Sequence, residues 1–167
     1  KFKKIEMIKI ILIFLTLFSI KSSCAQCDIK TNNRQDGNII KYFNPKPVIK
    51  EKEYELGTSI YKNQTTGQYL VNIVVLHKNG YSQDVSGDLK IQTNSYEGVS
   101  LNIIESKEVV MNGKKVTIAM FEIDKRSFNI LKNHTLKSIF FEMNGKMFGS
   151  SVSDNKSLFM NQLQCLE

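Results

Sequence analysis

Asn-Gly pairs divide this chain into short segments that favour β-strands. Three pairs occur, at 79–80, 112–113 and 144–145, and both residues tolerate the positive φ angles of a two-residue type I′ hairpin turn. Segments rich in Val, Ile, Tyr, Phe and Thr lie between these and other turn residues, which is typical of strands. We expect an edge strand within the turn-rich segment 27–48, and strands at 54–61, 68–78, 88–93, 99–110, 115–123, 136–143 and 146–152.

Two segments, 124–133 and 154–167, have apolar residues at helical spacing instead. In the second, Phe159, Leu163 and Leu166 recur at i, i+4 and i+7. We expect one short helix in each segment. The candidate N-cap residues are Asp124 or Ser127 for the first helix, and Ser153 or Asp154 for the second.

This order of elements predicts a mainly β fold. Strands at intervals of about 8–12 residues joined by tight turns are typical of sandwiches and barrels. We expect an antiparallel β-sandwich or partial barrel of about seven to eight strands, with one or two short helices, the last at the C-terminus. The sequence has neither the βαβ alternation nor the Gly-rich phosphate loop of a parallel nucleotide-binding fold, which argues against that class.

The N-terminal segment has the layout of a secretory signal peptide. Lysines near its start precede the apolar run 10–20, and a polar stretch follows. The run is about half of the ~20 residues that a membrane-spanning helix needs, so we expect no transmembrane helix in the mature chain. Residues 1–25 would then be a signal peptide, and 26–167 a single exported domain in the periplasm or outside the cell.

Two processing sites are compatible with this segment. Signal peptidase requires small residues at −3 and −1, which Ser23 and Ala25 supply, so cleavage would leave Gln26 as the first residue. Lipoprotein processing would instead acylate Cys24, although Lys21 stands where a leucine-like residue is usual. We favour cleavage after Ala25, with a lipid-anchored envelope protein as the alternative.

Either processing site leaves two cysteines, Cys27 and Cys165, at opposite ends of the mature chain. An even number of cysteines in an exported chain predicts a disulfide. This bond would pin the C-terminal helix to the start of the domain.

The charge of the mature chain argues against two classes of partner. The first 25 residues carry five lysines and one glutamate, so their removal lowers the net charge from +7 to +3. The remaining lysines alternate with polar and acidic residues along the chain, as on a solvated surface. We therefore expect no binding to nucleic acid or to an anionic membrane surface.

No motif marks a catalytic, metal or cofactor site. His77 and His134 are the only histidines, and their spacing from Cys27 and Cys165 matches no zinc site. We interpret both histidines as solvated polar residues, and we assign no catalytic residue, metal ligand or cofactor.

Two groups of carboxylates are possible cation or acid–base sites. Glu51, Glu53 and Glu55 alternate, so a strand would place them on one face. The interleaved lysines favour a charged edge strand instead. Asp84 and Asp88 flank a glycine, and we interpret this segment as an ordinary turn because the distal glutamate of an EF-hand is missing.

The sequence therefore favours a non-catalytic exported domain with a binding or structural role, for an unknown protein or small ligand. A small periplasmic hydrolase is the alternative, and it would require a histidine, a carboxylate and a serine in one pocket. An open sheet face that carries aromatic side chains would favour binding. The aromatic candidates for such a face are Tyr42, Phe43, Tyr54, Tyr61, Tyr69, Tyr81 and Tyr96.

Three stretches carry a resemblance to known sequences: the junction SCAQC, the strand GDLKIQT, and the tail LKSIFFEMNGK…LFMNQLQCLE. Together they resemble small uncharacterised exported proteins of Gram-negative bacteria. The resemblance implies an exported location and a β fold with a closing helix, and it implies no catalytic or binding residue.

Overall fold

The computed structural model describes residues 27–78 and 83–167. The described chain is mainly β with a C-terminal helix, which confirms the expected fold class. The predicted signal peptide 1–25, the processing sites at Ala25, Gln26 and Cys24, and the turn at 79–80 lie outside the described residues. The elements are β1 (Lys30–Asn33), β2 (Ile39–Tyr42), β3 (Lys46–Lys50), β4 (Tyr54–Asn63), β5 (Tyr69–His77), β6 (Val85–Thr93), β7 (Gly98–Leu101), β8 (Ile103–Met111), β9 (Lys114–Ile123), α2 (Lys125–Asn133), β10 (Leu136–Met143), β11 (Lys146–Ser151) and α3 (Leu158–Leu166).

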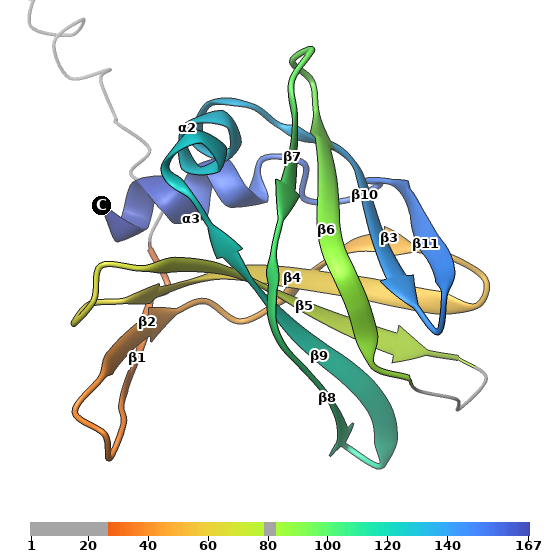
Figure 1. Ribbon diagram of the computed structural model, residues 1–167, viewed down its shortest axis with the longest axis horizontal. Helices are drawn as coiled ribbons and strands as arrows, with labels where there is room; N and C mark the ends of the chain where they lie inside the picture. The colour runs from red at the N-terminus through yellow and green to blue at the C-terminus, as the bar shows by residue number, and fades with distance from the viewer. Residues whose placement is uncertain (1–26, 79–82) are drawn as a thin grey trace, which may run out of the picture.

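The strands form two antiparallel sheets. Sheet A has the order β1-β2-β4-β5-β9-β8, and β3 pairs with the half of the β4 edge that β2 leaves free. Sheet B has the order β11-β10-β6-β7. In Figure 1, β4 and β5 of sheet A run across the molecule, β6 and β7 of sheet B cross over them in this view, and both helices lie above sheet A. The β1–β2 and β8–β9 hairpins extend downward from sheet A in this view.

The two described Asn-Gly turns join hairpins as expected. Asn112 and Gly113 have φ angles of 51° and 73° between β8 and β9, and Asn144 and Gly145 have 50° and 70° between β10 and β11. Positive φ at both positions is the requirement of a type I′ turn, so the local chemistry of these pairs sets the register of both hairpins.

The structure has more strands than the seven or eight expected. The segment 27–48 contributes to three strands rather than one, and Pro47 is tolerated in β3 because that strand lies at an edge. The expected strand 99–110 is divided at Asn102, where the chain passes from sheet B to sheet A. There the carbonyl of Asn102 accepts a hydrogen bond from the Glu122 N–H at 3.0 Å.

The first helix begins as predicted and the second begins later. Asp124 caps α2, since its Oδ1 accepts a hydrogen bond from the Ser127 N–H at 2.7 Å. The expected caps of α3, Ser153 and Asp154, both donate their N–H groups to the Val48 carbonyl instead. These bonds tie residues 153 and 154 to β3, so α3 begins only after Ser157.

One hydrophobic core fills the space between the two sheets and the helices. Phe121 of β9, Phe141 of β10 and Phe159 of α3 are its largest buried side chains. Burial of each such side chain stabilises the fold by about 1.5–3 kcal/mol. The apolar stripe predicted for the last helix is confirmed, because Leu163 and Leu166 are buried with Phe159.

A disulfide joins Cys27 to Cys165, as predicted, with the two Cα atoms 5.9 Å apart. It links the segment before β1 to the last turn of α3. None of the described helices has the length and apolar character needed to cross a membrane.

Candidate binding surface

Sheet A carries apolar side chains on the face that points away from the core. Val71, Ile73 and Val75 of β5 are fully buried in the core, so the residues between them point to the opposite side. Cross-strand pairing extends this second face over β2, β4, β9 and β8. We call this surface the outer face; its apolar side chains are Tyr42, Tyr61, Leu70, Val74, Leu76, Val109, Met111, Val116, Ile118 and Met120.

None of these ten side chains belongs to the core cluster between the two sheets, although Val116 is only 5% exposed. Antiparallel sheets with one face in water normally alternate apolar and polar residues. On β5 and β9 the alternation is lost, because Val74 and the paired Ile118 are as apolar as the core residues beside them. The core therefore does not explain the apolar character of the outer face.

The outer face is broad enough to be a binding surface. It spans four inter-strand spacings of about 4.8 Å from β2 to β8, and about 20 Å along β5 from Leu70 to Leu76. Its footprint is on the order of 400 Å², within the range of the largest apolar patches on monomeric proteins, which are often functional.

Two buried polar residues lie at the centre of the outer face. Asn72 is only 2% exposed, and its Nδ2 donates a hydrogen bond to Ser59 Oγ at 3.4 Å. Its Oδ1 has no partner among the described residues. An unpaired buried acceptor costs about 1–3 kcal/mol, so Asn72 is not optimised for the stability of the isolated chain.

Only two of the seven candidate aromatic residues lie on the outer face. Tyr42 and Tyr61 stack there with ring centroids 5.2 Å apart. Burial, and secondarily the neighbouring Tyr42, raises the pKa of Tyr61, so its hydroxyl stays protonated and can donate a hydrogen bond. Of the others, Phe43 and Tyr54 are in the core, Tyr69 packs on Phe128, Tyr96 is exposed, and Tyr81 lies outside the described residues.

The border of the outer face carries charges of both signs. Glu105 and Lys107 of β8 form an ion pair at 3.0 Å. Glu55 of β4 forms another with Lys78 at 3.4 Å. Mixed charge around an apolar centre is the usual composition of a protein–protein interface.

The two histidines do not form a common site. His77 ends β5, whereas His134 follows α2, a helix that starts from the opposite end of the β5–β9 pair. Burial lowers the pKa of His77, against a smaller opposite effect of Glu108, and its buried Nε2 has no described partner. The adjacent cavity, about 380 Å³, has no carboxylate or serine among its described lining residues, which are Leu76, His77, Lys78, Gly113, Lys114 and Lys115.

The candidate carboxylates do not form a cation site either. Glu51 and Glu53 lie in the β3–β4 connection and only Glu55 is in β4. The charged edge strand expected there is wrong, because β4 is paired on both sides, with β2 and β3 along one edge and β5 along the other. Over residues 27–78 and 83–167, no group of three His, Cys, Asp or Glu side chains is placed to hold a metal.

The expected turn between Asp84 and Asp88 is also wrong. Strand β6 continues through this segment with an irregular register around Gly87, whose φ is 68°. Positive φ is easy for glycine, so a bulge in the strand replaces the turn. Asp88 accepts a hydrogen bond from Ser100 Oγ at 3.1 Å across the β6–β7 pair.

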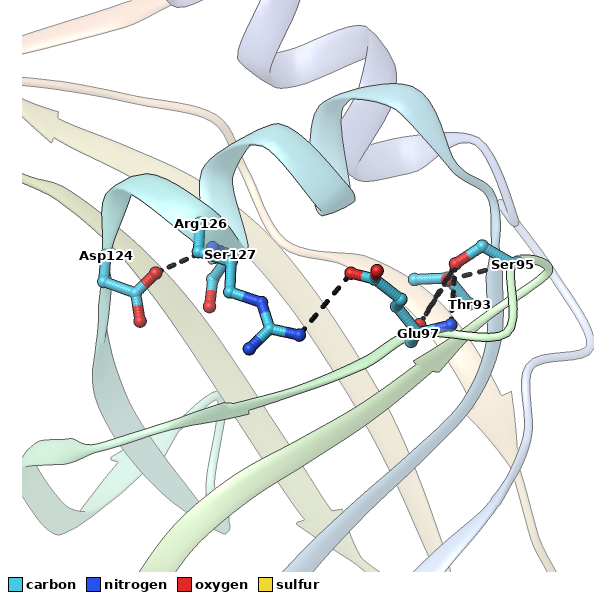
Figure 2. A network of polar contacts seen from close by, with 6 residues as sticks. All are labelled: Thr93, Ser95, Glu97, Asp124, Arg126 and Ser127. Atoms are coloured by element: carbon cyan, nitrogen blue, oxygen red, sulfur yellow. Dashed lines mark hydrogen bonds and ion pairs between the residues drawn. The ribbon is translucent and has the colours of Figure 1, made fainter.

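A polar network beside α2 has a structural role (Figure 2). Arg126 in the first turn of α2 forms an exposed ion pair with Glu97 at 3.6 Å. The Glu97 carbonyl accepts hydrogen bonds from the hydroxyls of Thr93 and Ser95, at 2.9 and 3.1 Å. These contacts order the β6–β7 connection and attach it to α2. The Ser95 hydroxyl donates to a neighbouring backbone carbonyl, so it is not paired with a general base as a catalytic serine would be.

No family model, curated protein sequence or solved structure matches this chain. Its function is therefore argued from its own residues. The outer face could not be recognised from the sequence, although β5 carries a signal for it: apart from Asn72 and the terminal His77, the strand is apolar at both odd and even positions. Such a strand has two apolar faces rather than one.

Proposed function

We propose that this chain is a non-catalytic exported domain that binds another protein through the outer face of sheet A. The observation that carries the proposal is the set of ten apolar side chains on that face, none of which belongs to the core cluster between the two sheets. A contiguous apolar surface with a polar border is the usual sign of an interaction site.

The dimensions and charge of the outer face favour a protein as the partner. A standard interface buries about 800 Å² on each partner, of which somewhat more than half is apolar. The apolar footprint of about 400 Å², extended by one ring of charged side chains, has that size and composition. A nucleic acid or an anionic membrane would instead favour a basic surface.

The disulfide between Cys27 and Cys165 supports an oxidising compartment, either the periplasm or the outside of the cell. In this proposal residues 1–25 are the signal peptide and Gln26 begins the mature protein. Acylation of Cys24 would give the same domain a lipid anchor in the envelope. The cavity that His77 lines has neither a carboxylate nor a serine among its described lining residues, so it gives the hydrolase alternative no support.

Site-specific photo-crosslinking in the natural host tests this function. A photoreactive residue at Ile118 should give a discrete adduct, and one at exposed Lys90 on sheet B should not. Val74 pairs directly with Ile118, so Val74→Asp should abolish the adduct by placing a charge in the interface. An adduct of twice the chain mass would identify the partner as a second copy.

Three results would contradict the proposal: no adduct at Ile118, the same adducts at Lys90, or an Ile118 adduct that is insensitive to Val74→Asp. The unfolding transition of the Val74→Asp protein is the control for folding. Because Val74 does not belong to the core cluster, the variant should remain folded.

A further inference from the structure

A cavity of about 380 Å³ lies beside the disulfide and shares no lining residue with the outer face. The start of the described chain, the β2–β3 connection and the loop before α3 surround it. Buried Phe43, Leu158 and Gln162 line its inner part, together with half-buried Cys165. The cavity has room for about a dozen water molecules, which is the size of a pocket for a small metabolite.

Gln162 is held in place at this cavity by the backbone of sheet A. Ile60 of β4 is paired with neither β2 nor β3. Its N–H instead donates a hydrogen bond to Gln162 Oε1 at 2.7 Å. Gln162 is only 4% exposed, and its Nε2 donates to no described residue. A fixed amide at the cavity wall therefore retains unused donors.

The mouth of the cavity is cationic. Lys46 and Lys156 lie on different segments of its wall, and neither forms an ion pair with a described residue. Asp28 is the one acidic residue among the lining residues that the structure describes. Two lysines against one aspartate leave a positive balance at the entrance.

The start of α3 adds further donors at the same place. Ser157, the N-cap residue, makes no side-chain capping bond, in contrast to Asp124 at the start of α2. The first N–H groups of a helix need external acceptors and attract anions. Ser157 and Leu158 both line the cavity, close to both lysines and Gln162. The Leu158 N–H already donates to the Asn155 carbonyl at 2.9 Å, so only the N–H groups that follow it in the first turn remain for a ligand.

We propose that this cavity binds a small molecule that carries a carboxylate. The lysines and the uncapped helix start would hold the carboxylate, Gln162 would donate to a neutral polar group, and Phe43 and Leu158 would contact the carbon skeleton. Carboxylate oxygens can accept several of these hydrogen bonds at once. The Cys27–Cys165 bond fixes the wall of the site, since both cysteines line it.

The test is a titration of the oxidised full-length mature chain followed by backbone amide NMR at constant ionic strength. Succinate should give saturable shifts at residues 156–162. Succinamide, its neutral counterpart, should not, and inorganic phosphate should bind at least tenfold more weakly. Non-saturating shifts, equal effects of succinamide, or equal binding of phosphate would overturn the assigned ligand class.

Variants separate the site from general charge effects. Lys46→Gln with Lys156→Gln should weaken succinate binding at least tenfold. The matched control, Lys90→Gln with Lys137→Gln, makes the same charge change on exposed residues of sheet B and should leave binding unchanged. Unchanged binding in the first pair, or an equal loss in both, would overturn the proposal.

Gln162→Glu provides an independent check on the buried amide. A glutamate keeps an acceptor for the Ile60 N–H but removes the Nε2 donors and adds a negative charge. It should reduce succinate binding at least tenfold while the spectrum of the two sheets is preserved. Wild-type affinity in this variant would contradict a role for Gln162.

Discussion

Replacement of Cys165 by serine should lower the free energy of unfolding by about 2–4 kcal/mol. The disulfide joins residues that are 138 positions apart. For a loop of that length, chain-entropy arguments give about 5 kcal/mol as an upper value. Without the cross-link the unfolded chain has more conformational entropy, which favours unfolding. The measured loss should be smaller, since real unfolded chains retain some structure.

The structure also indicates which of the two segments joined by the disulfide becomes more dynamic first when the bond is lost. Helix α3 is one candidate, because it is short and carries Cys165. However, α3 buries Phe159, Leu163 and Leu166, and its Leu166 carbonyl accepts a hydrogen bond from Lys62 Nζ at 2.6 Å. Strand β1 is exposed throughout and pairs only with β2. Residues 27–33 should therefore loosen before α3.

Urea unfolding measures the first effect, and amide hydrogen exchange measures the second. Cys27→Ser removes the same bond and should give the same loss within error, which controls for effects of the serine at either position. A loss below about 1 kcal/mol would refute the entropic argument. Faster exchange in α3 than in β1 would refute the assignment of the weaker end.

Three further predictions concern single polar groups. Asp124→Ala should cost about 1 kcal/mol at neutral pH in urea unfolding, whereas Asp124→Asn keeps the cap and should cost far less. Because the Ser127 N–H lowers the pKa of Asp124 from 3.8, its contribution should be complete above that pH and decline as the pH falls through the lowered value; a pH-independent cost would contradict this. Burial lowers the pKa of His77 from 6.5, so the unfolded chain takes up its proton first and the fold should lose stability as the pH falls below 6.5. In His77→Gln the difference in unfolding free energy between about pH 7.5 and about pH 5.5 should shrink, and an unchanged difference would show that His77 is not its source. Ser59→Ala with Asn72→Val removes a hydrogen bond and an unpaired acceptor together, so thermal unfolding should show no loss of stability or a gain of about 1 kcal/mol, and a clear loss would mean that Asn72 is satisfied in the folded chain.

The parts of the fold that depend on local chemistry could be predicted from the sequence. Asn112-Gly113 and Asn144-Gly145 set their hairpins through their own φ preferences, and Asp124 caps α2 through one bond three residues away. The disulfide followed from the even number of cysteines in a chain that is expected to be exported. None of these inferences needs knowledge of which segments pack together.

The parts that depend on tertiary pairing could not be predicted. Strand β3 contains the strong β formers Val48 and Ile49, but Pro47 within so short a run argues against a strand, and its pairing depends on the half of the β4 edge that β2 leaves free. The late start of α3 depends on bonds to Val48, more than 100 residues away.

The two candidate sites could not be predicted from the sequence either, because they also depend on tertiary packing. The outer face is visible only once the core is known to take the odd residues of β5. The cavity beside the disulfide combines residues near positions 28, 44 and 160, which no local pattern relates. The sequence predicts the helices and strands, but it does not show which face of each one is buried in the core.

The central claim, that a partner covers the outer face, is tested most directly by the labelling rate of single cysteines. Ile118→Cys on the outer face and Lys90→Cys on sheet B are compared, each in the purified protein and in the intact host compartment. The oxidised Cys27–Cys165 pair does not react with a maleimide, so only the introduced thiol is labelled. If a partner covers the outer face, labelling at position 118 should slow several-fold in the host relative to the purified protein, while the rate at position 90 stays the same. Equal host-to-purified ratios at the two positions would contradict the claim.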